Sequence, residues 1–184
     1  MHKPILLVIT GRPGSGKTTL SEKLSREWCL PLVSRDRIKE GLVHTEGKCH
    51  TDLPDDANLM ATRAFFNTVD CLLSQGISLI AEAAFQHPLW EVNLAPFADK
   101  ARITILICQT DSHIALDRFL ERGLNDPDRI RFHGDKGVRM VKAGMKPQPG
   151  TYYAPHLDMP TIYVDTTDGY DPDIDKLRKR ILGE

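Results

Sequence analysis

The sequence has 184 residues, 41% of them hydrophobic and 27% charged, which is typical of one globular domain with a continuous core. Its 24 basic and 25 acidic residues give a formal net charge of −1, which argues against binding of extended nucleic acid by bulk charge. The four cysteines lack metal-binding spacing, and the first apolar run is too short for a signal peptide or a membrane span, so we expect a cytoplasmic protein that binds no membrane.

The first half of the chain predicts strands that alternate with helices. Its opening apolar run is typical of a strand buried on both faces of a parallel sheet. Proline and glycine mark the ends of the following elements. The expected elements are a strand over Ile5–Thr10, a helix that ends before Pro31, a strand at Leu32-Val33, a helix over Arg35–Leu42, a polar loop over residues 43–54 and a long helix from Pro54 to Gly76.

The second half continues the alternation. Asp111 is a good N-cap for one of its helices, because its side chain can accept hydrogen bonds from the first free backbone N–H groups. The expected elements are strands over Ile77–Ala81, Ile103–Cys108 and Thr161–Val164, helices over about 89–99, from Asp111 to Arg122, over about 135–145 and over 171–182, and a polar, irregular segment over 123–135. Alternation of this kind predicts a parallel sheet with helices on both faces, and the absence of repeats or linkers predicts one domain over residues 1–184.

The segment Gly11-Arg-Pro-Gly-Ser-Gly-Lys-Thr matches the phosphate-loop pattern G-x-x-x-x-G-K-[ST] at every fixed position. Glycines let the backbone N–H groups turn inward toward phosphate oxygens, and the following helix N-terminus adds a favourable dipole. Lys17 would contact the β and γ phosphates, and the Thr18 hydroxyl would bind magnesium. We therefore expect the P-loop nucleoside triphosphate hydrolase fold, three-layer α/β with a parallel sheet, with ATP and Mg²⁺ as ligands. The expected nucleotide-binding residues are Gly11, Arg12, Pro13, Gly14, Ser15, Gly16, Lys17, Thr18, Thr19 and Arg118.

Other residues must decide among the classes of P-loop protein. A GTPase needs an N/T-K-x-D guanine motif late in the chain, and this sequence has none. A mechanical ATPase has an apolar strand that ends in Asp-Glu and a larger body, and neither is present. A small kinase instead needs a carboxylate beside the acceptor and an arginine-bearing lid, and the sequence offers candidates for both.

Asp36 is the candidate carboxylate. It follows the second predicted strand, and ligands of open parallel sheets bind at the carboxyl ends of the strands. Asp36 could therefore accept a hydrogen bond from an acceptor hydroxyl and take its proton as a catalytic base. The alternative is that Asp36 only stabilises a helix N-terminus.

Arg118 and Arg122 lie one helical turn apart and lead into the polar segment 123–135, which we expect to be a lid. An arginine in a closing lid would neutralise the charge that spreads over the transferred phosphoryl oxygens. Arg122 is the better catalytic candidate, and Lys17 completes the catalytic set with Asp36. Arg129 and Arg131 are weaker candidates, and the basic run over 136–146 is typical of a solvated face.

Glu82 ends the third predicted strand, where its carboxylate could hold a magnesium-bound water or orient the acceptor. A structural role at the end of a buried strand is the alternative. For the acceptor itself, Asp36, Lys39 and Phe85 are candidate contacts, and His87 and Trp90 could also meet a ring, although such aromatic residues are more often part of the core. The loop histidines His44, His50 and His133 lack metal-ligand spacing.

The order of these motifs resembles the polynucleotide-kinase-like P-loop kinases, a group related to the zeta-toxin, chloramphenicol-phosphotransferase and gluconate-kinase families. The resemblance spans nearly the whole chain and rests on Gly11–Thr18, D-x-x-K at Asp36–Lys39, Glu82 at a strand end, R-x-x-x-R at Arg118–Arg122 and Val164-Asp-Thr-Thr. Polynucleotide kinases commonly have arginine where this chain has Lys39, and aspartate is common where it has Glu82. Lysine lacks the bidentate fork that arginine offers to a phosphate.

The resemblance implies a small kinase in which Lys17 and Thr18 bind phosphates and magnesium, Asp36 is the base and Arg122 is the lid arginine. It also implies that adenine lies between Arg118 and the loop Asp165–Gly169. The expected activity is transfer of the γ-phosphoryl group of ATP to a hydroxyl of a small molecule or of a nucleoside or polynucleotide 5′-end, by a protein that is a monomer by default. The alternative is a non-catalytic ATP-binding switch, which would need neither Asp36 nor Arg122.

Overall fold

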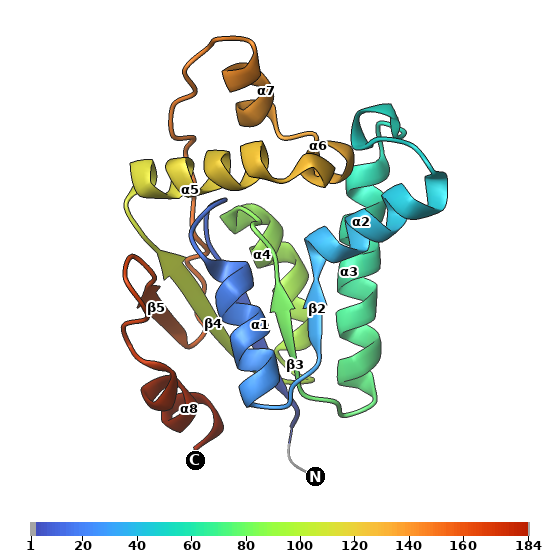
Figure 1. Ribbon diagram of the computed structural model, residues 1–184. Helices are drawn as coiled ribbons and strands as arrows, with labels where there is room; N and C mark the ends of the chain where they lie inside the picture. Colours follow the sequence, from blue (N-terminus) through green and yellow to red (C-terminus); the bar gives the residue numbers. More distant parts are fainter. Residues whose placement is uncertain (1–2, 184) are drawn as a thin grey trace.

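The computed structural model describes residues 3–183, which form one five-stranded sheet with helices on both sides (Figure 1). Every strand pair is parallel, and the strand order is β2-β3-β1-β4-β5. The first strand, β1, therefore lies at the centre of the sheet. The strands are β1 (Ile5–Thr10), β2 (Leu32–Ser34), β3 (Leu79–Glu82), β4 (Arg102–Gln109) and β5 (Thr161–Asp165).

The helices connect successive strands, as parallel pairing requires. They are α1 (Lys17–Glu27), α2 (Arg35–Glu46), α3 (Ala57–Ser74), α4 (His87–Leu94), α5 (Ser112–Asn125), α6 (Pro127–His133), α7 (Lys136–Lys142) and α8 (Ile174–Leu182). Two short 3₁₀ turns, His50–Asp52 and Ala95–Phe97, complete the described elements.

Successive residues of β1 bury opposite faces of the sheet, because side chains alternate along a strand. Leu6 and Val8 pack into a core with α3 and α4, whereas Leu7 and Ile9 pack into a second core with α1 and α8. All four side chains are fully buried. This two-sided burial explains why β1 is one continuous apolar run, and it fixes the start of the phosphate loop at the carboxyl end of the central strand.

Helices α5, α6 and α7 lie across the carboxyl ends of the strands, whereas α1 and α8 pack on one face of the sheet (Figure 1). Helix α2 packs beside α3 at the β2 edge, and α6 contacts α2. Helix α2 therefore covers one side of the carboxyl edge of the sheet, and the α5–α6 segment covers the other.

The expected three-layer parallel α/β fold is confirmed, and all five predicted strands are present. The prediction that residues 123–135 are irregular was wrong, because α6 occupies Pro127–His133. The Asp126 side chain accepts a hydrogen bond from the Asp128 N–H at 3.0 Å and caps this helix, and Gly134 ends it with a positive φ of 58°. Several other boundaries also moved. The second helix continues to Glu46, four residues into the predicted loop, the third strand is Leu79–Glu82, and the helix predicted over about 89–99 is α4, which ends at Leu94.

A search of the helices among residues 3–183 found none that is both long enough and apolar enough to cross a membrane.

Candidate active site

The phosphate loop turns sharply between β1 and α1. Two of its positions require glycine, because a Cβ there would collide with neighbouring atoms and because their φ angles are positive. Gly14 has a positive φ of 81°, and a Cβ there would lie 1.9 Å from the Ala115 carbonyl oxygen of α5. Gly11 has a φ of 154°, and a Cβ there would lie 2.4 Å from Ser15 Oγ. Only glycine tolerates such angles and such close backbone approach. The loop is therefore held between the sheet and helix α5.

A cavity of about 170 Å³ lies at the N-terminus of α1. The first backbone N–H groups of a helix have no acceptor within the helix, so those of α1 are free to bind anionic oxygens there. Among the described residues, the fully buried Ser15 hydroxyl has no hydrogen-bond partner, and Ser15 lies outside the lining of this cavity. The unpaired backbone donors of α1 fit the phosphates of a nucleotide. The cavity is lined by Gly14, Gly16, Lys17, Thr18, Thr19, Arg118 and Arg122.

Glu82 joins the phosphate loop to the second strand. Its carboxylate accepts hydrogen bonds from Ser34 Oγ at 2.7 Å and from Thr18 Oγ1 at 3.3 Å. Lys17 Nζ lies 3.8 Å from the same carboxylate, and both side chains are almost fully buried. A buried charge needs such partners, since desolvation of an unpaired carboxylate is costly.

The Thr18 hydroxyl and the Glu82 carboxylate fit a magnesium ion, which prefers oxygen ligands and keeps several of its waters beside phosphates. No cluster of three or more His, Cys, Asp or Glu side chains that could hold a metal occurs among the residues described.

Asp36 lies in the first turn of α2, directly after β2. Burial raises the pKa of its carboxyl group, but the positive charges of Lys17, Arg35 and Lys39 outweigh this effect and hold the pKa below its usual value. Asp36 is therefore ionised at neutral pH and can accept a hydrogen bond. Its Oδ1 lies 3.6 Å from Arg35 Nη1.

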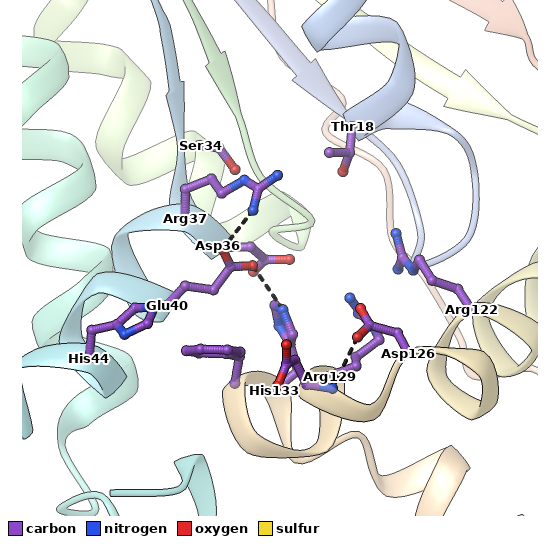
Figure 2. A pocket seen from close by; sticks show the side chains of 12 residues that line it. Thr18, Ser34, Asp36, Arg37, Glu40, His44, Arg122, Asp126, Arg129 and His133 are labelled. Atoms are coloured by element: carbon purple, nitrogen blue, oxygen red, sulfur yellow. Dashed lines mark hydrogen bonds and ion pairs between the residues drawn. The ribbon is translucent and has the colours of Figure 1, made fainter. Parts of the chain in front are cut away.

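A second cavity of about 420 Å³ lies between α2 and the α5–α6 segment (Figure 2). Asp36 lies on the α2 side of this cavity and Arg122 on the α5 side, with Thr18 of the phosphate loop between them in the view. Arg122 also lines the phosphate cavity, so the two cavities meet at this residue. The lining includes Thr18, Ser34, Asp36, Arg122, Arg129 and His133.

Helix α6 is docked on α2 by polar and aromatic contacts. His133 Nε2 lies 3.0 Å from Glu40 Oε1, and the rings of Phe132 and His44 are 4.8 Å apart. Arg129 Nε lies 2.7 Å from Asp135 Oδ2, which ties α6 to the start of α7. The segment predicted as a lid thus contacts α2 and lines the cavity.

On the other side of the phosphate loop, Arg118 binds the loop that follows β5. Its guanidinium donates to the carbonyl oxygens of Thr166 at 3.0 Å and of Thr167 at 2.6 Å. Thr166 Oγ1 in turn donates to the Ser15 carbonyl at 2.7 Å. A cavity of about 420 Å³ lies here, lined by Gly16, Thr19, Arg118, Thr167, Gly169 and Tyr170 among others. The structure therefore has an open space at the position predicted for adenine, next to the cavity at the N-terminus of α1.

Several predicted contacts lie outside these three cavities. Arg12 and Pro13 line another cavity, beside Phe119 and Tyr152. Phe85 packs in the aromatic core, with its ring 5.5 Å from Phe66 and 5.2 Å from Trp90. Lys39 is only 7% exposed, and burial with the nearby Arg35 lowers its pKa to about 8. These placements favour structural roles for Phe85 and Lys39.

The cavity beside Asp36 is also lined by residues that the sequence analysis did not select as substrate contacts. Glu40 lies one helical turn after Asp36, so the four-residue spacing could have indicated it. Ser34 lies beside Asp36 in sequence and binds Glu82. His133 was considered only as a metal ligand, and its contact with Glu40 spans 93 positions, which no local pattern reveals.

Comparison with known proteins supports the fold. Residues 6–143 match a family model described as an AAA domain. No curated protein matches the chain. A proposed kinase from Chloroflexus aurantiacus is 24% identical with a TM-score of 0.79, over 99% of this chain and 98% of that one. A sugar kinase from Janibacter sp. is 16% identical with a TM-score of 0.64, over 98% and 95%. An APS kinase from Mycobacterium tuberculosis, in complex with AMPPNP and APS, is 17% identical with a TM-score of 0.58, over 100% and 98%.

Proposed function

The chain belongs to the AAA-domain family and has the fold of P-loop kinases, and from this premise we propose that it is an ATP- and Mg²⁺-dependent kinase that phosphorylates a hydroxyl group. One observation carries the proposal. Asp36, Thr18 and Arg122 line a single cavity that meets the phosphate cavity at Arg122. Phosphoryl transfer requires a base, a phosphate-loop residue and a charge-stabilising arginine around one space. A nucleotide switch needs no such arrangement.

In the proposed reaction, the acceptor hydroxyl lies in the cavity beside Asp36 and points toward the γ-phosphorus. The acceptor oxygen forms a bond to this phosphorus, the bond from the phosphorus to the β,γ-bridging oxygen breaks, and ADP leaves. Asp36 accepts the hydroxyl proton. Lys17 and Arg122 stabilise the charge on the transferred oxygens, and a bound magnesium ion would neutralise further phosphate charge.

The docked α6 would keep bulk water away from the transferred group, which limits hydrolysis of ATP. We also propose that the sheet and this lid act as one kinase domain, in the cytoplasm. Among proteins of the same fold are kinases named for a sugar and for APS, which favours a small molecule as acceptor.

A transfer screen tests the proposal. γ-labelled ATP with Mg²⁺ is incubated with the protein and with sugars, polyols, nucleosides and oligonucleotides, and labelled products are separated. We expect label on at least one acceptor hydroxyl, and none when Mg²⁺ is omitted. ATP binding without transfer to any acceptor would favour the switch.

The phosphate loop gives a prediction about binding. ATP with Mg²⁺ at one hundred times its Kd should stabilise the protein by about 2.7 kcal/mol, or roughly 5–10 °C in Tm. In Lys17→Ala this shift should be much smaller, because the contact to the β and γ phosphates is lost. Differential scanning fluorimetry measures both shifts. Lys23→Ala is the matched control, since Lys23 lies on the same helix and pairs with Glu27. Equal shifts in wild type and Lys17→Ala would contradict the assignment.

The base-binding cavity gives a second prediction. Because Arg118 is fixed by the Thr166 and Thr167 carbonyls, it offers a flat guanidinium for stacking beside the Asp165–Gly169 loop. Stacking discriminates poorly between purines, so ATP should bind more tightly than GTP by less than about tenfold. Competition against a fluorescent ATP analogue measures the ratio. A clear preference for GTP would place guanine-specific contacts in this cavity and contradict the prediction.

A further inference from the structure

The cavity beside Asp36, between α2 and the α5–α6 segment, is called the acceptor cavity below. If the protein is the kinase proposed above, the charges that line this cavity determine which acceptors can enter it. Four carboxylates contribute to the lining: Asp36, Glu40, Asp126 and Asp128. Three arginines also contribute: Arg37, Arg122 and Arg129. Whether an anionic acceptor finds a partner depends on which of these cations is free.

Two of the arginines are already paired. Arg37 Nη1 lies 2.9 Å from Glu40 Oε2, and Arg37 Nη2 lies 3.5 Å from Glu22 Oε1. Arg129 Nε lies 2.7 Å from Asp135 Oδ2, in a pair whose side chains are only 11% and 14% exposed. An anion that recruited either arginine would leave a carboxylate without its partner, and at Asp135 that carboxylate is largely buried.

The third arginine, Arg122, lies where the acceptor and phosphate cavities meet. Its charge faces the space of the transferred phosphoryl group, which already carries negative charge. An acceptor that used Arg122 as its own anion site would compete with that group for the same guanidinium.

The histidine of the lid adds no positive charge at neutral pH. His133 is largely buried, and this burial, together with the nearby Arg129, lowers its pKa despite several neighbouring carboxylates. Its ring instead bonds Glu40, with Nε2 3.0 Å from Oε1.

Two of the carboxylates, in contrast, are unpaired. Asp126 and Asp128 are exposed at the start of α6, and no cation lies within ion-pair distance of either among the contacts of residues 3–183. The Asp126 side chain accepts the capping hydrogen bond from the Asp128 N–H. The lid therefore presents free negative charge to the cavity, opposite Asp36 on α2.

We propose that the acceptor is a hydroxyl compound without phosphate or carboxylate groups, and that a compound with an amino group is preferred. The paired arginines and the unpaired Asp126 and Asp128 carry this inference. The negative charge of these two carboxylates repels anionic acceptors and attracts a cationic one. Specificity of this kind depends on repulsion of the wrong acceptor as well as on attraction of the right one.

The test compares acceptors that share a skeleton and differ in charge. One series is glucosamine, glucose and glucuronate, and the second is 3′-amino-3′-deoxyadenosine, adenosine and adenosine 3′-phosphate. Transfer from γ-labelled ATP is measured as kcat/KM for each. In the series that reacts, kcat/KM for the amine should exceed that for the acid by about tenfold or more, because the two lid carboxylates attract the ammonium group and repel the acid.

A variant that removes the two lid charges separates the effect of charge from the effect of the acceptor's shape. Asp126→Asn/Asp128→Asn should lower the amine-to-acid ratio by about tenfold, since the lid carboxylates are gone while asparagine still caps α6. The control Asp99→Asn/Asp158→Asn removes the same charge from exposed sites outside the cavity and should leave the ratio unchanged. Faster transfer to the acids, or a ratio unaffected by the lid variant, would overturn the inference and leave the kinase intact. Transfer to no compound of any charge would remove the proposed function on which the inference rests.

Discussion

Asp36→Asn should lower phosphoryl transfer by about 10²–10⁴-fold, the range typical of a lost acid–base group. The protein mainly positions the reacting groups, and Asp36 would align the acceptor oxygen and take its proton. Asparagine keeps the shape and much of the hydrogen bonding but is a very weak base. Single-turnover transfer from γ-labelled ATP measures the loss, with ATP affinity measured separately and expected to stay unchanged.

The first turn of α2 offers a competing explanation for Asp36, because an acidic residue there stabilises a helix N-terminus by about 0.3–1 kcal/mol. That role predicts a small loss of stability and normal transfer by the folded protein. Urea unfolding of Asp36→Asn therefore accompanies the kinetics, with Asp55→Asn as a control at an exposed position. Equal transfer rates in wild type and Asp36→Asn would remove Asp36 as the base.

Arg122→Ala should lower kcat by about 10²-fold or more, as expected when one donor to a developing negative charge is lost. Arg122 lines both the phosphate and the acceptor cavities, so its guanidinium is placed to contact the transferred group in the transition state. The affinity for ATP should change little, because Lys17 and the backbone of the phosphate loop hold the ground state.

Steady-state kinetics separate the two effects, with kcat from saturating acceptor and ATP affinity from equilibrium binding. Arg139→Ala is the matched control, since Arg139 is an exposed arginine of α7 that lines none of the three cavities of the site. A normal kcat in Arg122→Ala would identify Arg122 as a surface residue. A loss of ATP binding equal to the loss of kcat would assign it to ground-state binding.

The sheet and the phosphate loop could be predicted because their signals are local. The apolar run of β1 is buried on both faces, and Gly11, Gly14 and Gly16 occupy backbone angles that other residues rarely adopt. The spacing of Lys17 and Thr18 after these glycines is fixed by the loop itself. The third strand could also be predicted, although its end at Glu82 depends on pairing with Ile9 and Ser34.

The acceptor cavity could not be predicted in the same way, because it is built from contacts between distant segments. Helix α6 has seven residues, too few to show a clear hydrophobic period, and it is held by tertiary contacts such as His133 with Glu40. Two other placements also depend on the fold. Lys39 and Phe85 have residue types that suit a substrate contact, and the structure places both outside the lining of this cavity.

The central claim is that the γ-phosphoryl group moves from ATP to a hydroxyl of a second molecule. The most direct measurement is the balance between ADP formed and labelled acceptor formed, with γ-labelled ATP, Mg²⁺ and the best acceptor from the screen. We predict one labelled acceptor per ADP, with the label on a hydroxyl oxygen, and ADP formation that falls sharply when the acceptor is omitted. Label recovered only as inorganic phosphate, at a rate independent of the acceptor, would contradict the claim.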